Sequence, residues 1–156
     1  MKFVVDCMLG KLAKWLKILG FDSQFFSYIE DDDLLKVAAQ EERVLLTRDT
    51  GLLQRAEKAN VQALFIEHED WRKQLTQVLD AFELRDKIKP YSRCVECNQA
   101  LKKISRDKAK NLVTPFVLKT ASGFALCPQC NRAYWNGTHH QKMDSTIEQL
   151  LENELE

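Results

Sequence analysis

The sequence predicts an α/β fold: a parallel sheet with crossover helices, followed by a small cysteine-containing module and a C-terminal helix. Short apolar runs alternate four times with helical spacing before residue 87, which is the pattern of strands joined by crossover helices. Four of the five cysteines then form two C-x-x-C pairs, and an apolar helical stripe lies near the end. At 156 residues, we expect one ordinary domain with an appendage.

The first strand and helix lie at the start of the sequence. Residues 2–6 (KFVVD) predict an apolar strand that ends on Asp6, and Gly20 ends the helix that follows. That helix has an apolar face of Leu9, Leu12, Leu16 and Leu19 and an opposite face of Lys11, Lys14 and Lys17. Cys7 follows the strand, and we expect it to be a small buried thiol.

The same alternation predicts three more pairs of strand and helix. An acidic cluster begins the second helix, and an apolar stripe marks the fourth. The expected strands are residues 21–27, 43–47 and 61–66, and the expected helices are residues 30–42, 51–59 and 70–82. Connections of this kind build a sheet whose strands all run in one direction.

A boundary follows near residue 87, where Pro90 and a shift in charge end the alternation. The C-terminal helix is expected to begin with a capping box at Ser145 and to dock through an apolar face. We therefore expect three parts: residues 1–86, a cysteine module at residues 87–142, and a helix at residues 143–156.

The net charge of zero hides a strong asymmetry. Residues 87–142 carry eleven Lys or Arg against only Glu96 and Asp107, a balance of +9, so the rest of the chain carries −9. A module this basic indicates a polyanionic partner. No apolar run is long enough to span a membrane, and lysines interrupt the first twenty residues. We therefore expect a cytoplasmic location and no membrane partner.

The two C-x-x-C pairs predict a structural zinc site. Each pair presents two thiolates to one ion, and two pairs complete a closed tetrahedral set that is structural rather than catalytic. The 29 residues between the pairs predict a long hairpin with two strand-like runs around Ser122 and Gly123. The expected zinc ligands are Cys94, Cys97, Cys127 and Cys130.

Acidic residues follow three of the predicted strands. Asp6 ends the first strand, the acidic run 31–33 follows the second, and Asp49 follows the third. Because parallel strands emerge at one edge of a sheet, we expect these carboxylates to gather there and to need a cation. Mg²⁺ or Mn²⁺, completed by water and substrate phosphate, suits such an edge. Taken one at a time, the same acids also suit helix capping.

This combination favours phosphodiester hydrolysis, because divalent ions activate water without a serine or histidine nucleophile. The sequence has no G-x-S-x-G, P-loop or G-x-G-x-x-G motif. Tyr134 is an alternative to Trp135 for base stacking, and both also suit packing over the zinc site. The residues expected to bind substrate are Lys11, Lys14, Arg48, Lys102, Lys103, Arg106, Trp135 and His139.

The segments VVDCMLGKLAKWLKILGFD, DDDLLKVAAQEERVLLTRD and CPQCNRAYWNGTH, with the first C-x-x-C pair between the last two, resemble in order those of the Mut7-C RNase domain family. The similarity covers residues 2 to about 143. That family is described as a PIN-like ribonuclease domain followed by a zinc ribbon. The resemblance therefore implies a metal-dependent endoribonuclease whose partner is RNA.

The resemblance also implies the catalytic acids by position. They are Asp6, either Asp31 or Asp32, and Asp49, with Asp6 and Asp49 binding Mg²⁺ or Mn²⁺. PIN domains commonly use a fourth acid, for which the candidates here are Glu67, Glu69 and Asp70.

Other functions stay open at this point. A catalytically inactive RNA-binding adaptor with the same fold would share the basic module and the zinc site. A nuclease that acts on DNA would share the acidic edge, and a ribbon that binds protein would share the cysteines. The sequence leaves the oligomeric state open.

Overall fold

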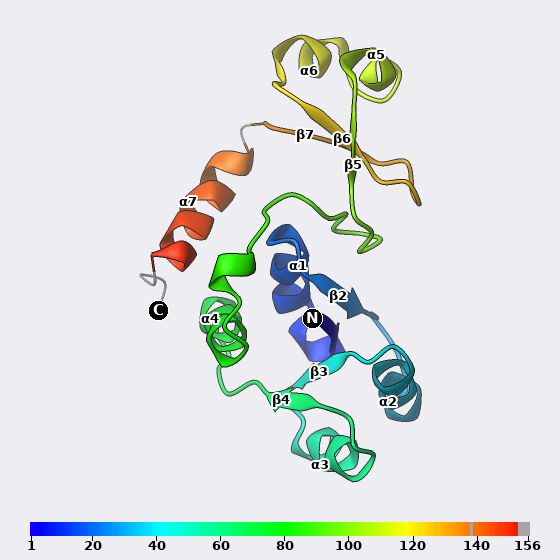
Figure 1. Cartoon of the computed structure of the whole chain (residues 1–156), viewed down its shortest axis with the longest axis vertical. Helices are drawn as coiled ribbons and strands as arrows, with labels where there is room; N and C mark the ends of the chain where they lie inside the picture. The colour runs from blue at the N-terminus through cyan, green and yellow to red at the C-terminus, as the bar shows by residue number, and fades with distance from the viewer. Residues whose placement is uncertain (138, 153–156) are drawn as a thin grey trace.

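A parallel sheet of four strands forms the centre of the first part of the chain (Figure 1). The structure is a computed structural model that describes residues 1–137 and 139–152. All three strand pairs are parallel, which confirms the predicted α/β class. The strands are β1 (Lys2–Val5), β2 (Asp22–Phe25), β3 (Val44–Thr47) and β4 (Ala63–Phe65), in the spatial order β2-β1-β3-β4. We call residues 1–86 the α/β unit.

Helices cover both faces of this sheet, because side chains alternate along each strand. Phe3 and Val5 pack against one pair of helices, whereas Val4 packs against the other pair. The first pair is α1 (Gly10–Ile18), preceded by the 3₁₀ helix η1 (Cys7–Leu9), and α4 (Trp71–Ala81); the second is α2 (Asp31–Gln40) and α3 (Thr50–Lys58). The central strands are thus buried on both sides, as their apolar runs predict.

Gly20 ends α1 as the sequence predicts. Its φ of 93° lies in the left-handed region, and a Cβ there would collide with the carbonyl oxygen of Lys89. The close approach lets the segment after η2 (Arg85–Lys87) lie against the end of α1, where the amide of Lys89 donates to Leu19.

A small antiparallel sheet forms the centre of the second part of the chain. Two short helices fill the connection between its first two strands, and Ala109, Ala121 and Phe124 form its core. The elements are β5 (Lys102–Ile104), α5 (Arg106–Ala109), α6 (Pro115–Thr120), β6 (Phe124–Leu126) and β7 (Ala133–Trp135), with strand order β5-β6-β7. We call residues 87–137 the ribbon; it lies at the top of Figure 1.

The prediction of two strand-like runs around Ser122 and Gly123 is half wrong. The run after Gly123 forms β6, but the run before Ser122 forms α6. Thr114 caps this helix by accepting a hydrogen bond from the amide of Val117, and Pro115 occupies its first turn. Pro at the start of a helix and Thr as its cap are start signals that outweigh the β-propensity of the apolar residues that follow.

The C-terminal helix begins earlier than predicted. Ser145 lies inside α7 (His139–Leu151), so the predicted capping box is wrong. The first turns of α7 are instead held by Tyr91, whose ring stacks on His140 at 4.2 Å and whose hydroxyl donates to Asp144 at 2.5 Å. Tertiary contacts thus make α7 begin at a position that no local capping pattern indicates. The predicted apolar docking face is confirmed for Ile147 and Leu150, which belong to the main core, but it is wrong for Leu151, which is 50% exposed.

The ribbon docks on the α/β unit through its first C-x-x-C turn. Asn98, which follows this turn with a φ of 62°, accepts a hydrogen bond from the amide of Ser23 at 2.9 Å and donates to Asp22 at 2.6 Å. Arg43 donates to the same carboxylate at 2.7 Å. The docked turn therefore satisfies part of the outer edge of β2, which would otherwise be open.

Lys17, which the sequence places opposite the apolar face of α1, is only 7% exposed. Its ammonium donates to the carbonyl oxygen of Val95 at 3.3 Å, because the first C-x-x-C turn covers this end of α1. Burial lowers the pKa of Lys17, although Glu96, Cys94 and Cys97 oppose that shift. Among the described residues, no helix combines the length and apolar character needed to cross a membrane.

Candidate functional site

The ends of β1 and β3 are joined by one hydroxyl group. Thr47, the last residue of β3, donates from Oγ1 to Oδ2 of Asp6 at 2.8 Å. The same oxygen accepts a hydrogen bond from the amide of Asp49 at 3.0 Å. Two of the predicted acids therefore lie at the carboxyl ends of adjacent strands, which is where ligands bind in parallel sheets.

Both acids also have a structural role. Asp49 caps α3 by accepting from the amide of Leu52 at 3.0 Å, and Asp6 accepts from the amide of Cys7 at 2.8 Å. Asp6 is 8% exposed, whereas Asp49 is exposed. Capping thus accounts for one oxygen of Asp49, and among the described residues its second oxygen has no hydrogen-bond partner.

The acids after β2 are paired with an arginine. Arg55 of α3 forms ion pairs with Asp31, at 3.5 Å, and with Asp32. All three side chains are at least 44% exposed, so water weakens these pairs. Burial, the charge of Asp6 and, to a smaller extent, the charge of Asp31 raise the pKa of the Cys7 thiol.

Cys7 itself is exposed beside these acids, so the prediction of a buried thiol is wrong. The chain turns into η1 directly after Asp6, and this turn directs Cys7 outward while Leu9 enters the core. The alternation of β1 does not continue past Val5, which is why the strand pattern misplaces the next residues.

Three other predicted site residues already have partners within the protein. Arg48 donates to the carbonyl oxygen of Ile66 at 3.1 Å, and the Lys11 ammonium lies 5.0 Å from the ring centre of Trp71. Asp70 caps α4 through the amides of Arg72 and Lys73. Glu67 and Glu69 are exposed, and neither has an ion-pair partner among the described residues.

Among the described residues, the predicted acids do not meet as a group of three or more metal ligands. Among the residues that the structure describes, the four cysteines are the one group of three or more possible ligands whose donor atoms meet. Mg²⁺ and Mn²⁺ need less, because they keep several waters and bind through one or two carboxylates and substrate phosphates. Asp6 and Asp49 provide such carboxylates at adjacent strand ends.

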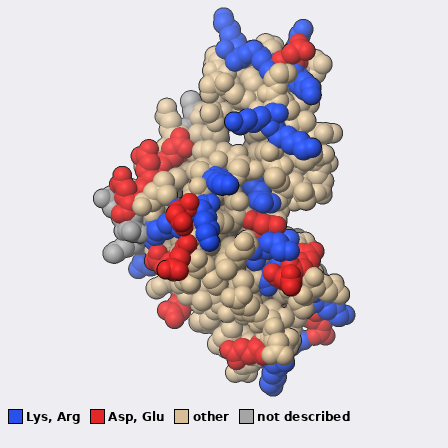
Figure 2. All heavy atoms as spheres, in the orientation of Figure 1, with Lys and Arg blue, Asp and Glu red and all other residues tan. Residues whose placement is uncertain are grey.

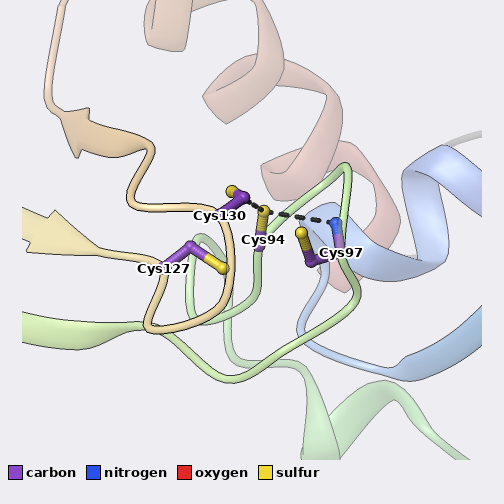
Figure 3. Close-up of side chains that lie close together, drawn as sticks. All are labelled: Cys94, Cys97, Cys127 and Cys130. Carbon is purple, nitrogen blue, oxygen red and sulfur yellow. Dashed lines mark hydrogen bonds between the residues drawn. The ribbon is translucent and has the colours of Figure 1, made fainter.

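The four cysteines of the ribbon form a candidate zinc site (Figure 3). Their sulfur atoms all lie within 4.8 Å of one another, and Cys94 and Cys130 are 3.8 Å apart. Tetrahedral Zn–S bonds of about 2.3 Å place sulfurs about 3.8 Å apart. The prediction that Cys94, Cys97, Cys127 and Cys130 come together is therefore confirmed, and their geometry fits Zn²⁺.

The two C-x-x-C turns have the same backbone design. Asn98 and Asn131 follow them at φ values of 62° and 59°, and their amides donate to Cys94 and Cys127 at 2.9 Å. Asn adopts this left-handed conformation more readily than most residues. The sequence signal for this feature, C-x-x-C-N at both turns, is visible in the printed chain.

Tyr134 supports the cysteine site from β7. Its hydroxyl lies 3.0 Å from Sγ of Cys94 and accepts from the amide of Val95 at 3.1 Å. Burial raises the pKa of Cys94, but hydrogen bonds from Tyr134 and from nearby amides overcome this effect and lower it to about 7. A hydrogen bond with Cys130, followed by burial, raises the pKa of Cys97 to about 12. Full deprotonation of the cluster therefore needs a cation.

One protein-family model matches nearly the whole chain. The model described as Mut7-C RNAse domain matches residues 1–147. The chain belongs to the Mut7-C RNAse domain family. The match confirms the resemblance seen in the sequence and supports a ribonuclease-type function. No curated protein and no solved structure matched the chain in the same comparisons.

The matched residues of this Mut7-C RNAse domain include the basic ribbon, whose exposed cations face several directions (Figure 2). Lys102 and Lys103 are exposed neighbours on β5. Arg106 donates to the carbonyl oxygen of Ala121 at 2.9 Å and lies over Phe124, so it also stabilises the ribbon. The side chain of His139 lies outside the part of the chain that the structure describes.

A cleft between the α/β unit and the ribbon was not foreseen from the sequence. Its volume is about 690 Å³, and its walls come from α1, the segment before Cys94, the β5-β6-β7 sheet and α7. It includes two of the predicted substrate-binding residues on its ribbon side, Lys103 and Trp135, and Lys14 on its α1 side. The sequence signal for this cleft was the group of aromatic residues around the cysteines. Their approach to one another could not be predicted, because it depends on how α7 packs against the core.

Proposed function

We propose that this Mut7-C RNAse domain is a metal-dependent endoribonuclease that hydrolyses RNA at the carboxyl edge of its parallel sheet. The observation that carries the proposal is the Asp6–Thr47–Asp49 arrangement, which holds two carboxylates at adjacent strand ends. Asp31 or Asp32 is the third catalytic acid in this proposal, because both lie in the first turn of α2 and both pair with Arg55. The cytoplasmic location stays a prediction.

The proposed roles follow from the contacts of each residue. Asp6 and Asp49 would hold Mg²⁺ or Mn²⁺, and the hydroxyl of Thr47 orients Asp6 toward the open edge. A bound divalent ion supplies activation of water and charge stabilisation at phosphorus. Arg55 pairs with Asp31 and would hold that carboxylate in place.

The ribbon has two proposed roles. Zn²⁺ bound by its four cysteines is structural, because a closed set of four sulfurs leaves no position for substrate. The exposed lysines of the ribbon would attract RNA by neutralising phosphates, an interaction that weakens as salt rises. Lys14 and Lys103 are the two cations that we place in contact with RNA, since both line the cleft.

The test is cleavage of end-labelled single-stranded RNA by the zinc-loaded protein with Mg²⁺, Mn²⁺ or neither. Asp6→Asn and Asp49→Asn keep the capping oxygens but weaken the metal site. We expect each to lower the cleavage rate by more than about 100-fold, since even outer-shell changes at metal sites cost 10- to 100-fold. Asp33→Asn is the matched control, because Asp33 is an exposed acid of the same run that pairs with Lys36. Equal rates in all four proteins would refute the proposed site.

A second candidate is an RNA-binding adaptor without turnover. The pairing of Arg55 with two acids favours it, because an arginine can neutralise the acidic edge without a metal. This candidate predicts metal-independent RNA affinity that falls steeply with salt and does not change in Asp49→Asn. Competition between RNA and DNA oligonucleotides of one sequence separates both candidates from a nuclease that acts on DNA.

A further inference from the structure

The cleft between the α/β unit and the ribbon has the features of a binding site for a flat, negatively charged ligand. Its volume of about 690 Å³ falls within the range of sites that hold small organic groups. Most of its surface is apolar, and aromatic side chains from three different segments contribute to it. None of the acidic residues that the structure describes lines it.

Two unpaired cations from different elements line the cleft. Lys14 comes from α1 and Lys103 from β5, and both side chains belong to exposed residues. Within the described part of the chain, neither ammonium has a hydrogen-bond or ion-pair partner. A ligand with negative charges on both sides of an apolar group would therefore complement this cleft.

Aromatic rings form the apolar part of the cleft. Tyr91 and His140 stack with ring centres 4.2 Å apart and an interplanar angle of 6°, which gives a rigid flat platform. Trp135, on β7, is 37% exposed, and Phe124 lies beside it on β6. Nucleobases stack on such rings regardless of sequence, because every base has a π face.

We propose that this cleft binds an unpaired nucleotide of single-stranded RNA, with its base on Trp135 and its flanking phosphates at Lys14 and Lys103. The inference rests on the proposed function, since it assumes RNA as the substrate, and it narrows that substrate to RNA with unpaired bases. Duplex RNA does not fit, because its bases are stacked on each other and its accessible groove presents mainly sugars.

The position of the cleft agrees with a substrate that extends to the acidic edge. α1 begins just after Asp6 and runs toward the ribbon (Figure 1). Lys14 lies about 6 Å along this helix from its first residue, Gly10, given a rise of about 1.5 Å per residue. A strand held in the cleft can therefore follow α1 to the proposed catalytic acids.

The test is equilibrium binding of a short fluorescent single-stranded RNA to the full zinc-loaded chain without Mg²⁺ or Mn²⁺, measured by anisotropy over a salt series. We expect Trp135→Ala to weaken binding by about 5- to 100-fold with an unchanged salt slope, because one stacked base is lost. Trp135→Phe keeps an aromatic face and should recover most of the affinity. Zinc content and circular dichroism check that each variant is folded.

A change of charge should have a different signature. Lys103→Gln removes one phosphate contact, so the slope of log Kd against log salt should fall by about 0.7. Lys119→Gln is the matched control, because Lys119 is an exposed lysine of the same ribbon outside the cleft. The same RNA strand annealed to its complement should bind with no dependence on Trp135.

The outcomes separate this inference from the proposed function. Normal RNA binding by Trp135→Ala and Lys103→Gln, in a protein that still cleaves RNA, overturns the cleft but not the nuclease. Cleft-dependent binding without any metal-dependent cleavage supports the cleft and refutes the nuclease. Failure of the wild-type protein to bind single-stranded RNA at low salt overturns the inference and leaves the cleft to another class of ligand.

Discussion

Thr47 shows how one hydroxyl can organise a strand edge. It is fully buried, donates to Asp6 and accepts from the amide of Asp49, so its proton and one of its lone pairs are used. A valine at this position would have the same shape but would leave two polar groups without a partner. Hydrophobic patterning places Thr47 at the end of β3, but only the structure shows which carboxylate its hydroxyl contacts.

Cys7 offers a chemical probe of the same edge. Burial, the charge of Asp6 and a hydrogen bond to Asp6 raise the pKa of its thiol above the usual value. Because the thiolate is the reactive form, alkylation of Cys7 at pH 8 should be slower than that of an unperturbed cysteine, and its rate should still rise with pH above 9. Asp6→Asn removes the charge, so the pKa should fall and alkylation at pH 8 should become faster. Mass spectrometry of the Cys7 peptide after iodoacetamide treatment measures both rates.

The control for this experiment is Asp33→Asn, which removes a charge from an exposed acid that pairs with Lys36. Its alkylation rate should equal that of the wild type. Zinc-loaded protein is required, since the thiolates of the cluster are then held by the metal. An unchanged rate in Asp6→Asn would contradict the electrostatic contact between Asp6 and Cys7.

Two residues differ from what local patterns indicate, for different physical reasons. Cys7 was predicted to be buried and is exposed, and Lys17 lies on the helix face opposite the leucines and is nevertheless buried. Cys7 is exposed because η1 replaces the strand after Asp6. Lys17 is buried because Val95, far along the chain, covers it. A helical wheel reports the faces of one helix and contains no information about a partner that docks later in the sequence.

At the scale of elements, the two C-x-x-C turns have the same backbone conformation, but in the described part of the chain only the first forms hydrogen bonds with the α/β unit. Both end in Asn with positive φ, and both place an amide on the first cysteine. Only Asn98 has a further role, since its side chain joins the amide of Ser23 and the carboxylate of Asp22. Asn131 is exposed and has no side-chain hydrogen bond among the described residues. The pair therefore provides an internal comparison.

Asn98→Gly should destabilise the zinc-loaded protein by about 1 to 3 kcal/mol, because it leaves the Ser23 amide and the Asp22 carboxylate short of a partner. Glycine tolerates the positive φ, so the turn itself is not strained. Asn131→Gly makes the same chemical change in an equivalent backbone and should have a much smaller effect. Urea unfolding of both variants measures the difference. Equal free energies of unfolding for the two variants would show that the contact with β2 contributes nothing.

Element prediction succeeded where local pattern and tertiary environment agree. The four parallel strands and their helices follow directly from apolar runs and helical spacing, because each is buried on the face that the pattern marks. α6 departs from prediction because its short apolar run suits either a strand or a helix, and capping by Thr114 favours the helix. α7 departs because Tyr91 extends it toward the ribbon. The Thr114–Pro115 start signal is visible in the sequence, whereas the contacts of Tyr91 leave no trace in sequence spacing.

At the scale of the whole molecule, three contacts join the ribbon, with its candidate zinc site, to the α/β unit and to α7. Lys17 contacts Val95 next to Cys94, Asn98 contacts β2, and Tyr91 contacts α7. The C-x-x-C pairs predicted the four-cysteine group, and the charge shift predicted the basic module. The coupling between the parts was not predictable, because it depends on side chains that are polar and unremarkable in sequence.

Loss of zinc should therefore weaken the α/β unit as well as the ribbon. Structural zinc contributes on the order of 10 kcal/mol to the folding of small modules. Even the part transmitted through the docking contacts, about 1 to 3 kcal/mol, should lower the Tm of the α/β unit by about 4 to 24 °C. Cys130→Ser removes one ligand, and Cys7→Ser makes the same substitution outside the cluster as the matched control.

The α/β unit carries its own reporter for this test, since Trp15 and Trp71 stack with ring centres 4.8 Å apart inside it. In a Trp135→Phe background these are the remaining tryptophans, so thermal melting followed by their fluorescence reports the α/β unit alone. Cys130→Ser should lose zinc and melt earlier by this probe, whereas Cys7→Ser should not. An unchanged melt in zinc-free Cys130→Ser would show that the two parts fold independently and that the ribbon is an appendage. An earlier melt would show that zinc in the ribbon stabilises the sheet that carries the proposed catalytic acids.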